Sequence, residues 1–137
     1  MTGLIWVIQI LHYPAFYYVG QNQFAEFHSL HTKKITFIVL PVMLLELVTA
    51  LFLAVQNFSS ILLWSNLFCL LLIWLSTFLV SVPLHHSLSI AMNVQAITRL
   101  IKTNWTRTFL WSLRLGLLIY FALSYLRAGG QDVNFSH

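Results

Sequence analysis

Charge is what this sequence has least of. Only 7% of its 137 residues are charged and just three are acidic, whereas a soluble domain carries roughly a quarter charged residues. At 59% hydrophobic, the chain cannot cover a water-facing surface, so its composition indicates an integral membrane protein. Its length allows a single membrane domain, residues 1–130, followed by a polar and mobile tail, residues 131–137. Basic residues flank apolar stretches, which is typical of membrane topology and not of nucleic-acid binding.

Cysteine is almost as scarce. The single Cys69 excludes an intrachain disulfide and a cysteine-based zinc site, and its place in an apolar stretch is typical of a small core residue. The first apolar segment, residues 4–19, has no basic residue before it and no Ala-x-Ala site. A cleaved signal peptide is therefore not expected.

Four apolar segments predict the fold. A helix needs about 17–25 residues to cross a bilayer, and stretches of this kind, the first of them short, cover residues 4–19, 35–55, 61–82 and 105–126. Residues 84–103 repeat apolar side chains at helical spacing with polar ones opposite, which indicates a helix lying at the membrane surface. The sequence thus predicts an all-α membrane protein, a four transmembrane helix bundle with an amphipathic surface helix before the fourth span.

Prolines and glycines predict where these helices bend or end. Pro14 is expected to bend the first segment and Pro41 to kink the second, because proline removes a backbone donor and clashes with the preceding turn. Pro83 is expected to end the third span, and the Ala-Gly-Gly sequence of residues 128–130 the fourth.

Basic residues predict the orientation. The second connection and the N-terminus have none, and Arg127 is the one basic residue after the fourth span. The first and third connections carry Lys33, Lys34, Arg99, Lys102 and Arg107. The positive-inside rule places these two connections in the cytoplasm and both termini outside.

Two charged residues, Glu46 and Arg114, lie deep inside the apolar spans. Glu46 lies about 18 Å along its helix from Lys34, and Arg114 about 10 Å along its helix from Arg107. Because a guanidinium is costly in hydrocarbon, we predict that Glu46 and Arg114 form a pair. The polar side chains predicted around this pair are Gln9, His12, Asn104, Trp105 and Arg107. Three interpretations are open: a structural pair that fixes helix register, a binding or active-site cavity, and a contact with another subunit.

Two more helices carry polar faces. On the first segment, Gln9, His12, Tyr13 and Phe16 share one side by their spacing of three and four. The third span has a stripe of mostly small polar side chains, a pattern that lets membrane helices approach closely. This stripe consists of Asn66, Cys69, Ile73, Ser76 or Thr77, and Ser81.

Six histidines permit metal or haem chemistry. His28 and His31, three residues apart, form a candidate metal site with His85 or His86, and only one of that adjacent pair is expected to join, since the two point about 100° apart on a helix. Haem ligation by His12 lacks a second histidine inside a span. The Glu-x-x-His pairs of di-iron bundles are absent from the sequence. No cofactor is therefore predicted, with metal and haem as minor alternatives.

Four motifs occur together in this chain: Gln9–Pro14, Phe27–Ile35, Val82–His85 and Asn104–Thr108. In them the sequence resembles a family of small, uncharacterised four-span bacterial membrane proteins and, more remotely, the DUF1772 or anthrone-oxygenase-like group. The resemblance implies a four-span fold in the bacterial inner membrane. If the group's best-known activity applies, it also implies cofactor-independent oxygenation of a polycyclic anthrone. The pocket residues that it implies are His85, Asn104, Trp105 and Arg107.

Three functions follow as hypotheses. The leading one is a small inner-membrane protein that serves as an accessory subunit of a larger membrane complex, with the bilayer, other subunits or a homo-oligomer as partners. The alternative is a cofactor-independent oxygenase or isomerase acting on a lipophilic ring compound, with His12 or His85 as base and Arg107 or Arg114 holding an enolate or phenolate. A transporter subunit is the third, and the sequence lacks the internal repeat that many transporters show.

Overall fold

The computed structural model describes the backbone of residues 1–132 and the side chains of residues 1–127. Within that part of the chain every regular element is helical. Most of the predicted mobile tail, residues 133–137, lies outside the described residues.

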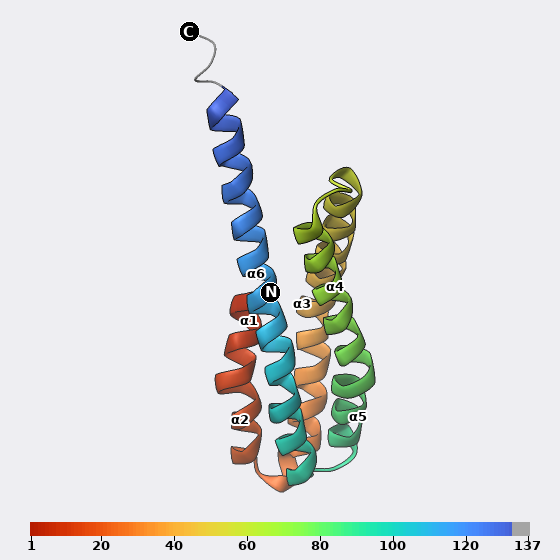
Figure 1. Ribbon diagram of the computed structural model, residues 1–137. Coiled ribbons are helices and arrows are strands. Elements are labelled where there is room, and N and C mark those ends of the chain that lie inside the picture. The colour runs from red at the N-terminus through yellow and green to blue at the C-terminus, as the bar shows by residue number, and fades with distance from the viewer. Residues whose placement is uncertain (133–137) are drawn as a thin grey trace.

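The chain folds into four helical segments, one short and three long, that lie side by side (Figure 1). Two short π-helical turns (η1 and η3) and one 3-10 turn (η2) interrupt the first and third segments. In chain order the elements are α1 (Thr2–Val7), η1 (Ile8–His12), α2 (Tyr13–Ala15), η2 (Phe16–Tyr18), α3 (Gln21–Gln56), α4 (Ile61–Ser76), η3 (Thr77–Ser81), α5 (Val82–Ile90) and α6 (Val94–Asp132).

The three long segments are long and apolar enough to cross a membrane, which agrees with a multi-pass membrane protein. They cover Gln21–Gln56, Ile61–Ile90 and Val94–Arg127. The first segment, from Thr2 to Tyr18, reaches only about 25 Å at 1.5 Å per residue, less than the roughly 30 Å of a hydrocarbon core. Crossing of the membrane by all four segments stays a prediction.

The predicted surface helix over residues 84–103 is wrong. Residues up to Ile90 extend the third segment, and α6 starts at Val94. Ala91 is extended, and the side chain of Asn93 accepts the Ala96 backbone N–H at 3.0 Å, an N-cap that starts α6. Several apolar residues of this stretch face the bundle interior, where Leu88, Ile97 and Leu100 are fully buried. Helical periodicity alone does not distinguish a face on lipid from a face on protein.

The glycines after the fourth span do not end it either. Helix α6 continues through residues 128–130 to Asp132. A glycine inside a helix costs only about 1 kcal/mol relative to alanine, which the preceding turns of α6 offset.

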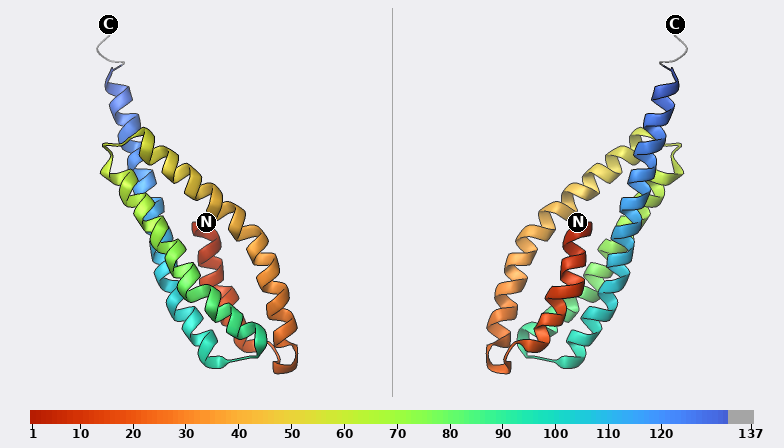
Figure 2. Two further views of the ribbon diagram at one scale, coloured as in Figure 1. Left: turned by 90° about the vertical axis from the view of Figure 1, so that its right-hand side faces the viewer. Right: turned by 90° about the vertical axis from the view of Figure 1, so that its left-hand side faces the viewer.

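Pro83 acts differently from the prediction, and π-turns precede both Pro14 and Pro83. The turn η1 comes just before Pro14, and η3 comes just before Pro83, which therefore continues the third segment instead of ending it. A wider turn relieves the clash between the proline ring and the preceding turn. Pro41 lies inside α3, which bows along its length (Figure 2).

The core has two apolar clusters with a polar layer between them. One cluster surrounds Leu70 and Trp111 in the middle of the bundle, and the other surrounds Phe16 and Ile97 near the α5–α6 turn. The short first segment lies against α6 (Figure 1) and starts level with Trp111, whose carbonyl accepts the Thr2 hydroxyl at 3.2 Å. Its polar side therefore faces the layer between the two clusters.

Candidate functional site

One face of α6 organises the buried polar side chains. Asn104, Arg107, Thr108 and Arg114 are all less than 7% exposed, and their spacing of three, four and seven places them along one stripe. The other helices contribute the remaining buried polar residues, which are Gln9, His28, Asn66 and Ser81. The predicted stripe on the third segment is confirmed at Asn66, Cys69, Ile73 and Ser81, all buried.

The predicted pair of Glu46 and Arg114 is confirmed. Arg114 Nη1 donates to Glu46 Oε2 at 2.6 Å and Nη2 donates to Asn66 Oδ1 at 3.3 Å, while the Asn66 amide donates back to the Arg114 carbonyl at 3.1 Å. The guanidinium carbon also lies 4.8 Å from the ring centroid of Trp111. The amino group of Met1 lies 3.2 Å from the other carboxylate oxygen. These contacts hold α3, α4 and α6 in register and engage both terminal nitrogens of Arg114, whereas its Nε is buried without a hydrogen-bond partner.

Arg107, two helical turns earlier, has a different environment. Its Nη1 donates to Ser81 Oγ at 3.1 Å and to Asn104 Oδ1 at 3.2 Å, and Asn104 in turn donates to Gln9 Oε1 at 2.8 Å. Its Nε is buried without a hydrogen-bond partner. Among the described side chains no carboxylate pairs with Arg107. A buried guanidinium supported only by neutral groups carries an uncompensated charge.

Arg107 lines a cavity of about 460 Å³ between α3 and the third segment. Most of its wall is apolar, with Met43 and Trp74 at the mid-bundle end, and the indole N–H of Trp74 is buried without a partner. The polar groups that line it are Tyr13, Thr32, Thr36, Thr77, Ser81, His85, His86, Ser89 and Arg107. Both π-turns contribute to the wall, as such turns often do at functional sites.

Four histidines gather beside this cavity. His12 Nε2 lies 2.7 Å from His31 Nδ1, and His28 Nε2 lies 3.0 Å from His85 Nδ1. The His31 ring centroid lies 6.0 Å from that of His85 and 6.2 Å from that of His28. Phe16 packs edge-on against His12, His28 and His31. The sequence predicted separate roles for His12 and His28, and the fold brings both into one cluster.

The hydrogen bonds of this cluster link the cavity to the end of the bundle. His85 Nε2 lies 3.2 Å from the Tyr13 hydroxyl, and His28 Nδ1 lies 3.2 Å from Ser89 Oγ. Tyr13 is buried, whereas Ser89 is exposed one turn from the α5–α6 connection. A continuous series of donors and acceptors therefore runs from the interior to the surface.

The candidate metal residues are partly brought together. His28 and His31 share the cluster with His85. Only one of the adjacent His85 and His86 was expected to join such a group, and His86 lies outside the cluster in the cavity wall. In residues 1–132 no group of three or more His, Cys, Asp or Glu side chains is arranged to hold a metal ion. The paired ring nitrogens lie at hydrogen-bond distance, closer than the roughly 3.3 Å between two ligands of a tetrahedral zinc.

Six of the predicted catalytic and binding residues do not line the cavity, namely Gln9, His12, Glu46, Asn104, Trp105 and Arg114. Trp105 was expected at the pocket, but it is half exposed on the outer face of α6, edge-on to Trp6 at 5.7 Å. Arg114 and Glu46 are bound to each other deeper in the bundle.

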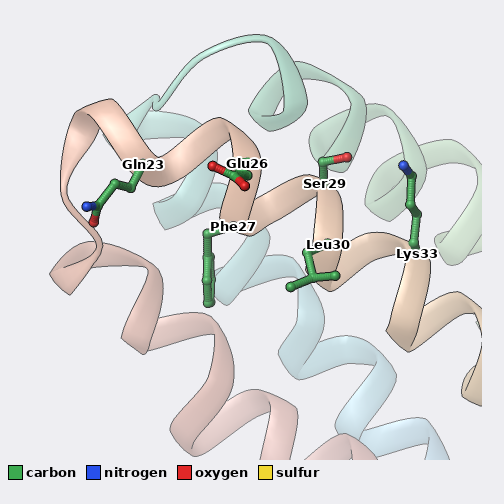
Figure 3. Close-up of a pocket in the computed structure, with 6 residues that line it drawn as sticks. All are labelled: Gln23, Glu26, Phe27, Ser29, Leu30 and Lys33. Atoms are coloured by element: carbon green, nitrogen blue, oxygen red, sulfur yellow. The ribbon is translucent and has the colours of Figure 1, made fainter.

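A second hollow, lined by Gln23, Glu26, Phe27, Ser29, Leu30 and Lys33, lies over α3 alone (Figure 3). With no wall from a second element, it does not enclose a ligand.

Comparisons of the chain with protein-family models, curated proteins and solved structures give no match. The function must therefore be argued from the site itself.

Some residues of the site were not singled out for it from the sequence. Tyr13 was placed only on the polar face of the first segment, and Ser89 only on the expected surface helix. Trp74 was not singled out. For Tyr13 a signal was present, because it lies next to His12 on a polar face of an otherwise apolar segment. Ser89 enters the site through the extension of the third segment past Pro83, which the sequence pattern did not show.

Proposed function

We propose that the cavity binds a lipophilic ring compound through an oxygen atom and transfers a proton to or from it without a resident cofactor. In this proposal Arg107 holds a carbonyl, enolate or phenolate oxygen, and His85 with Tyr13 is the proton-transfer pair. The observation that carries the proposal is Arg107 itself, a buried cation with no carboxylate partner among the described side chains, in the wall of an apolar cavity.

The charge of Arg107 supports an oxyanion ligand. A guanidinium is a rigid fork of donors suited to oxygen anions, and charged residues inside membrane segments usually mark a functional site. Arg114, on the same face of the same helix, has a carboxylate at 2.6 Å. An oxyanion in the cavity would compensate Arg107 as Glu46 compensates Arg114. The unpartnered Trp74 N–H in the same wall supplies a second donor.

The neighbouring Tyr13 and His85 support proton transfer. Both line the cavity, and the phenol oxygen lies 3.2 Å from His85 Nε2, which is within reach for a general acid–base pair. Loss of a proton from carbon beside a carbonyl would create an enolate whose charge falls on the oxygen that Arg107 holds. This electrostatic stabilisation is usually the largest contribution to such a reaction.

The outer wall of the cavity supports a lipophilic ligand. Leu40, Phe78 and Val82 line it and are also exposed on the flank of the bundle, at 44%, 57% and 51%. If the long helices cross a bilayer, these side chains contact hydrocarbon, and the ligand reaches the cavity sideways from the membrane. We place the end with Lys33, Lys34, Arg99 and Lys102 in the cytoplasm of a bacterial inner membrane, following the positive-inside rule.

The test uses 1-naphthol and naphthalene as matched probes, titrated by calorimetry into the protein in lipid nanodiscs and into empty nanodiscs. Arg107→Gln should weaken 1-naphthol binding by about 10- to 150-fold, because a hydrogen bond to a charged group is worth about 1.5–3 kcal/mol. Naphthalene, which has no oxygen, should bind both proteins equally. Arg99→Gln, at an exposed position of α6, is the control and should leave both affinities unchanged.

Thermal stability separates this proposal from a purely structural Arg107. A residue that serves ligand binding at the expense of folding stability can be replaced without loss of stability. The Arg107→Gln variant should therefore keep or raise the midpoint of thermal unfolding. Equal 1-naphthol affinity in wild type and Arg107→Gln would refute the proposal. A lower midpoint with unchanged binding would assign Arg107 to the fold.

An accessory subunit is the second candidate, supported by a different observation. Beyond the first segment, the last part of α6 projects from the bundle (Figure 1), and Tyr120, Tyr125 and Leu126 on it are 61–71% exposed. A partner helix or lipid can cover this apolar surface. A partner here would be compatible with chemistry in the cavity at the opposite end of the molecule.

A further inference from the structure

We infer that Tyr13, His85, His28 and Ser89 form a proton relay that carries the proton of the cavity reaction to and from water at the end of the bundle. The inference rests on the proposed function, because it assigns the route of the proton that the cavity removes. It adds two residues outside the proton-transfer pair, His28 and Ser89, and gives each a role.

The geometry of the relay is continuous. The distances are 3.2 Å from the Tyr13 hydroxyl to His85 Nε2, 3.0 Å from His85 Nδ1 to His28 Nε2, and 3.2 Å from His28 Nδ1 to Ser89 Oγ. The residues come from α2, α5 and α3, so no single helix imposes this order. Both nitrogens of both imidazoles are engaged, which is the arrangement that lets a neutral imidazole accept a proton on one side and release one on the other.

The resting direction of the relay follows from Ser89. Its hydroxyl donates to the carbonyl of His85 at 3.0 Å, so its oxygen is free to accept from His28 Nδ1–H. His28 Nε2 then accepts from His85 Nδ1–H, and His85 Nε2 accepts from the Tyr13 hydroxyl. Every donor meets an acceptor, and the cavity end presents a basic nitrogen behind the phenol.

The transfer balances without a charge being left on the relay. A proton leaves carbon of the ligand for the Tyr13 oxygen as the phenol proton moves to His85 Nε2. The Nδ1 proton of His85 moves to His28 Nε2 and the Nδ1 proton of His28 moves to Ser89 Oγ. The serine's own hydrogen turns from the His85 carbonyl to water and is released there. The ligand keeps the electron pair as an enolate on the oxygen beside Arg107, and return of a proton along the same route resets both tautomers.

The surroundings favour this neutral route over a stored imidazolium. Arg107 already places one positive charge in the same wall as His85, and two like charges in a cavity of low polarity repel strongly. His12 and His31 pack beside the relay. Neither offers a compensating negative charge.

The test follows deuterium uptake at the methylene carbon of anthrone in D₂O, without oxygen, with the protein in nanodiscs and empty nanodiscs as background. His28→Gln keeps hydrogen-bonding groups but cannot exchange tautomers, and Ser89→Val replaces the exit hydroxyl with an apolar group of similar size. Both should slow exchange at least about tenfold, since general acid–base groups contribute roughly 10²–10⁴. His28→Gln should also leave 1-naphthol affinity unchanged, because His28 does not line the cavity.

Ser87→Val is the matched control. Ser87 is also exposed on α5 and also donates to a backbone carbonyl, that of Leu84 at 2.8 Å, but it does not contact a histidine of the relay. Exchange at the wild-type rate in Ser87→Val, with slow exchange in the other two variants, would support the relay.

The failures are distinguishable. Wild-type exchange rates in both His28→Gln and Ser89→Val would overturn the relay and leave the proposed function standing. Loss of exchange together with loss of 1-naphthol binding in His28→Gln, with Ser89→Val unaffected, would also overturn the relay and assign His28 to the fold. Wild-type protein that does not accelerate exchange would overturn both proposals.

Discussion

Replacing either Glu46 or Arg114 should destabilise the protein, and the two replacements should differ in their cost. The side chain of Arg114 is 5% exposed and that of Glu46 is 26% exposed. Glu46→Gln leaves the guanidinium buried with only Asn66 and the face of Trp111, and loss of one partner of a buried pair costs about 3–5 kcal/mol. Arg114→Gln leaves a carboxylate that the Met1 amino group still pairs with at 3.2 Å, so its cost should be lower, about 1–3 kcal/mol.

The assay is thermal unfolding in detergent, followed by circular dichroism. For a chain of this size, 1 kcal/mol corresponds to a shift of roughly 3–4 °C, so Glu46→Gln should lower the midpoint by about 9–20 °C. The double variant should lose less than the sum of the single variants, because neither charge is left alone. Glu26→Gln, at an exposed position near the start of α3, is the control. Unchanged midpoints in both single variants, or strict additivity, would refute the reasoning.

Two further predictions concern the cavity wall and the projecting helix. Trp74→Phe should weaken 1-naphthol binding by about 2- to 12-fold and leave naphthalene binding unchanged, since a neutral hydrogen bond is worth about 0.5–1.5 kcal/mol; calorimetry checks this, and equal affinities would show that the indole N–H does not face the ligand. If α6 carries a partner subunit, native mass spectrometry of gently extracted protein should show a larger assembly that Tyr120→Lys disrupts, with an absorption spectrum of the same sample to detect haem. A bare chain in both proteins would argue against the accessory subunit.

Much of the bundle was predictable because apolar composition and length determine membrane helices. The three long helices, the turn after Gln56 and the buried stripe on the third segment agree with the prediction. The Glu46–Arg114 pair was predictable for the same reason, since helical rise places both residues at similar depth and no other carboxylate occurs inside an apolar span. Spacing along the sequence is enough to predict an ion pair when the chain offers few possible partners.

The remaining errors arise at prolines and glycines, whose effect depends on their neighbours. Pro83 was expected to end a helix, yet a π-turn lets the helix continue by two more turns, which places His85 and Ser89 beside His28 of α3. The sequence grouped His28 and His31 with His85 or His86, but it did not place His12 in this group, because the position of His12 depends on η1. Neither turn has a sequence pattern that distinguishes it from a helix end.

The scarcity of acidic residues also explains why the two arginines of α6 differ. Arg107 and Arg114 are seven residues apart and therefore lie on nearly the same face, so both point inward. Inside the apolar spans the chain has a single carboxylate, Glu46, and it binds Arg114. Arg107 is held by three neutral residues on three segments, Ser81, Asn104 and, through Asn104, Gln9. These contacts fix its position without neutralising it.

A guanidinium that only fixed the register of the helices would gain from a carboxylate at Ser81, whereas a guanidinium that binds an oxyanion must be positioned by neutral groups. The Ser81→Asp variant should therefore raise the unfolding midpoint and abolish 1-naphthol binding together.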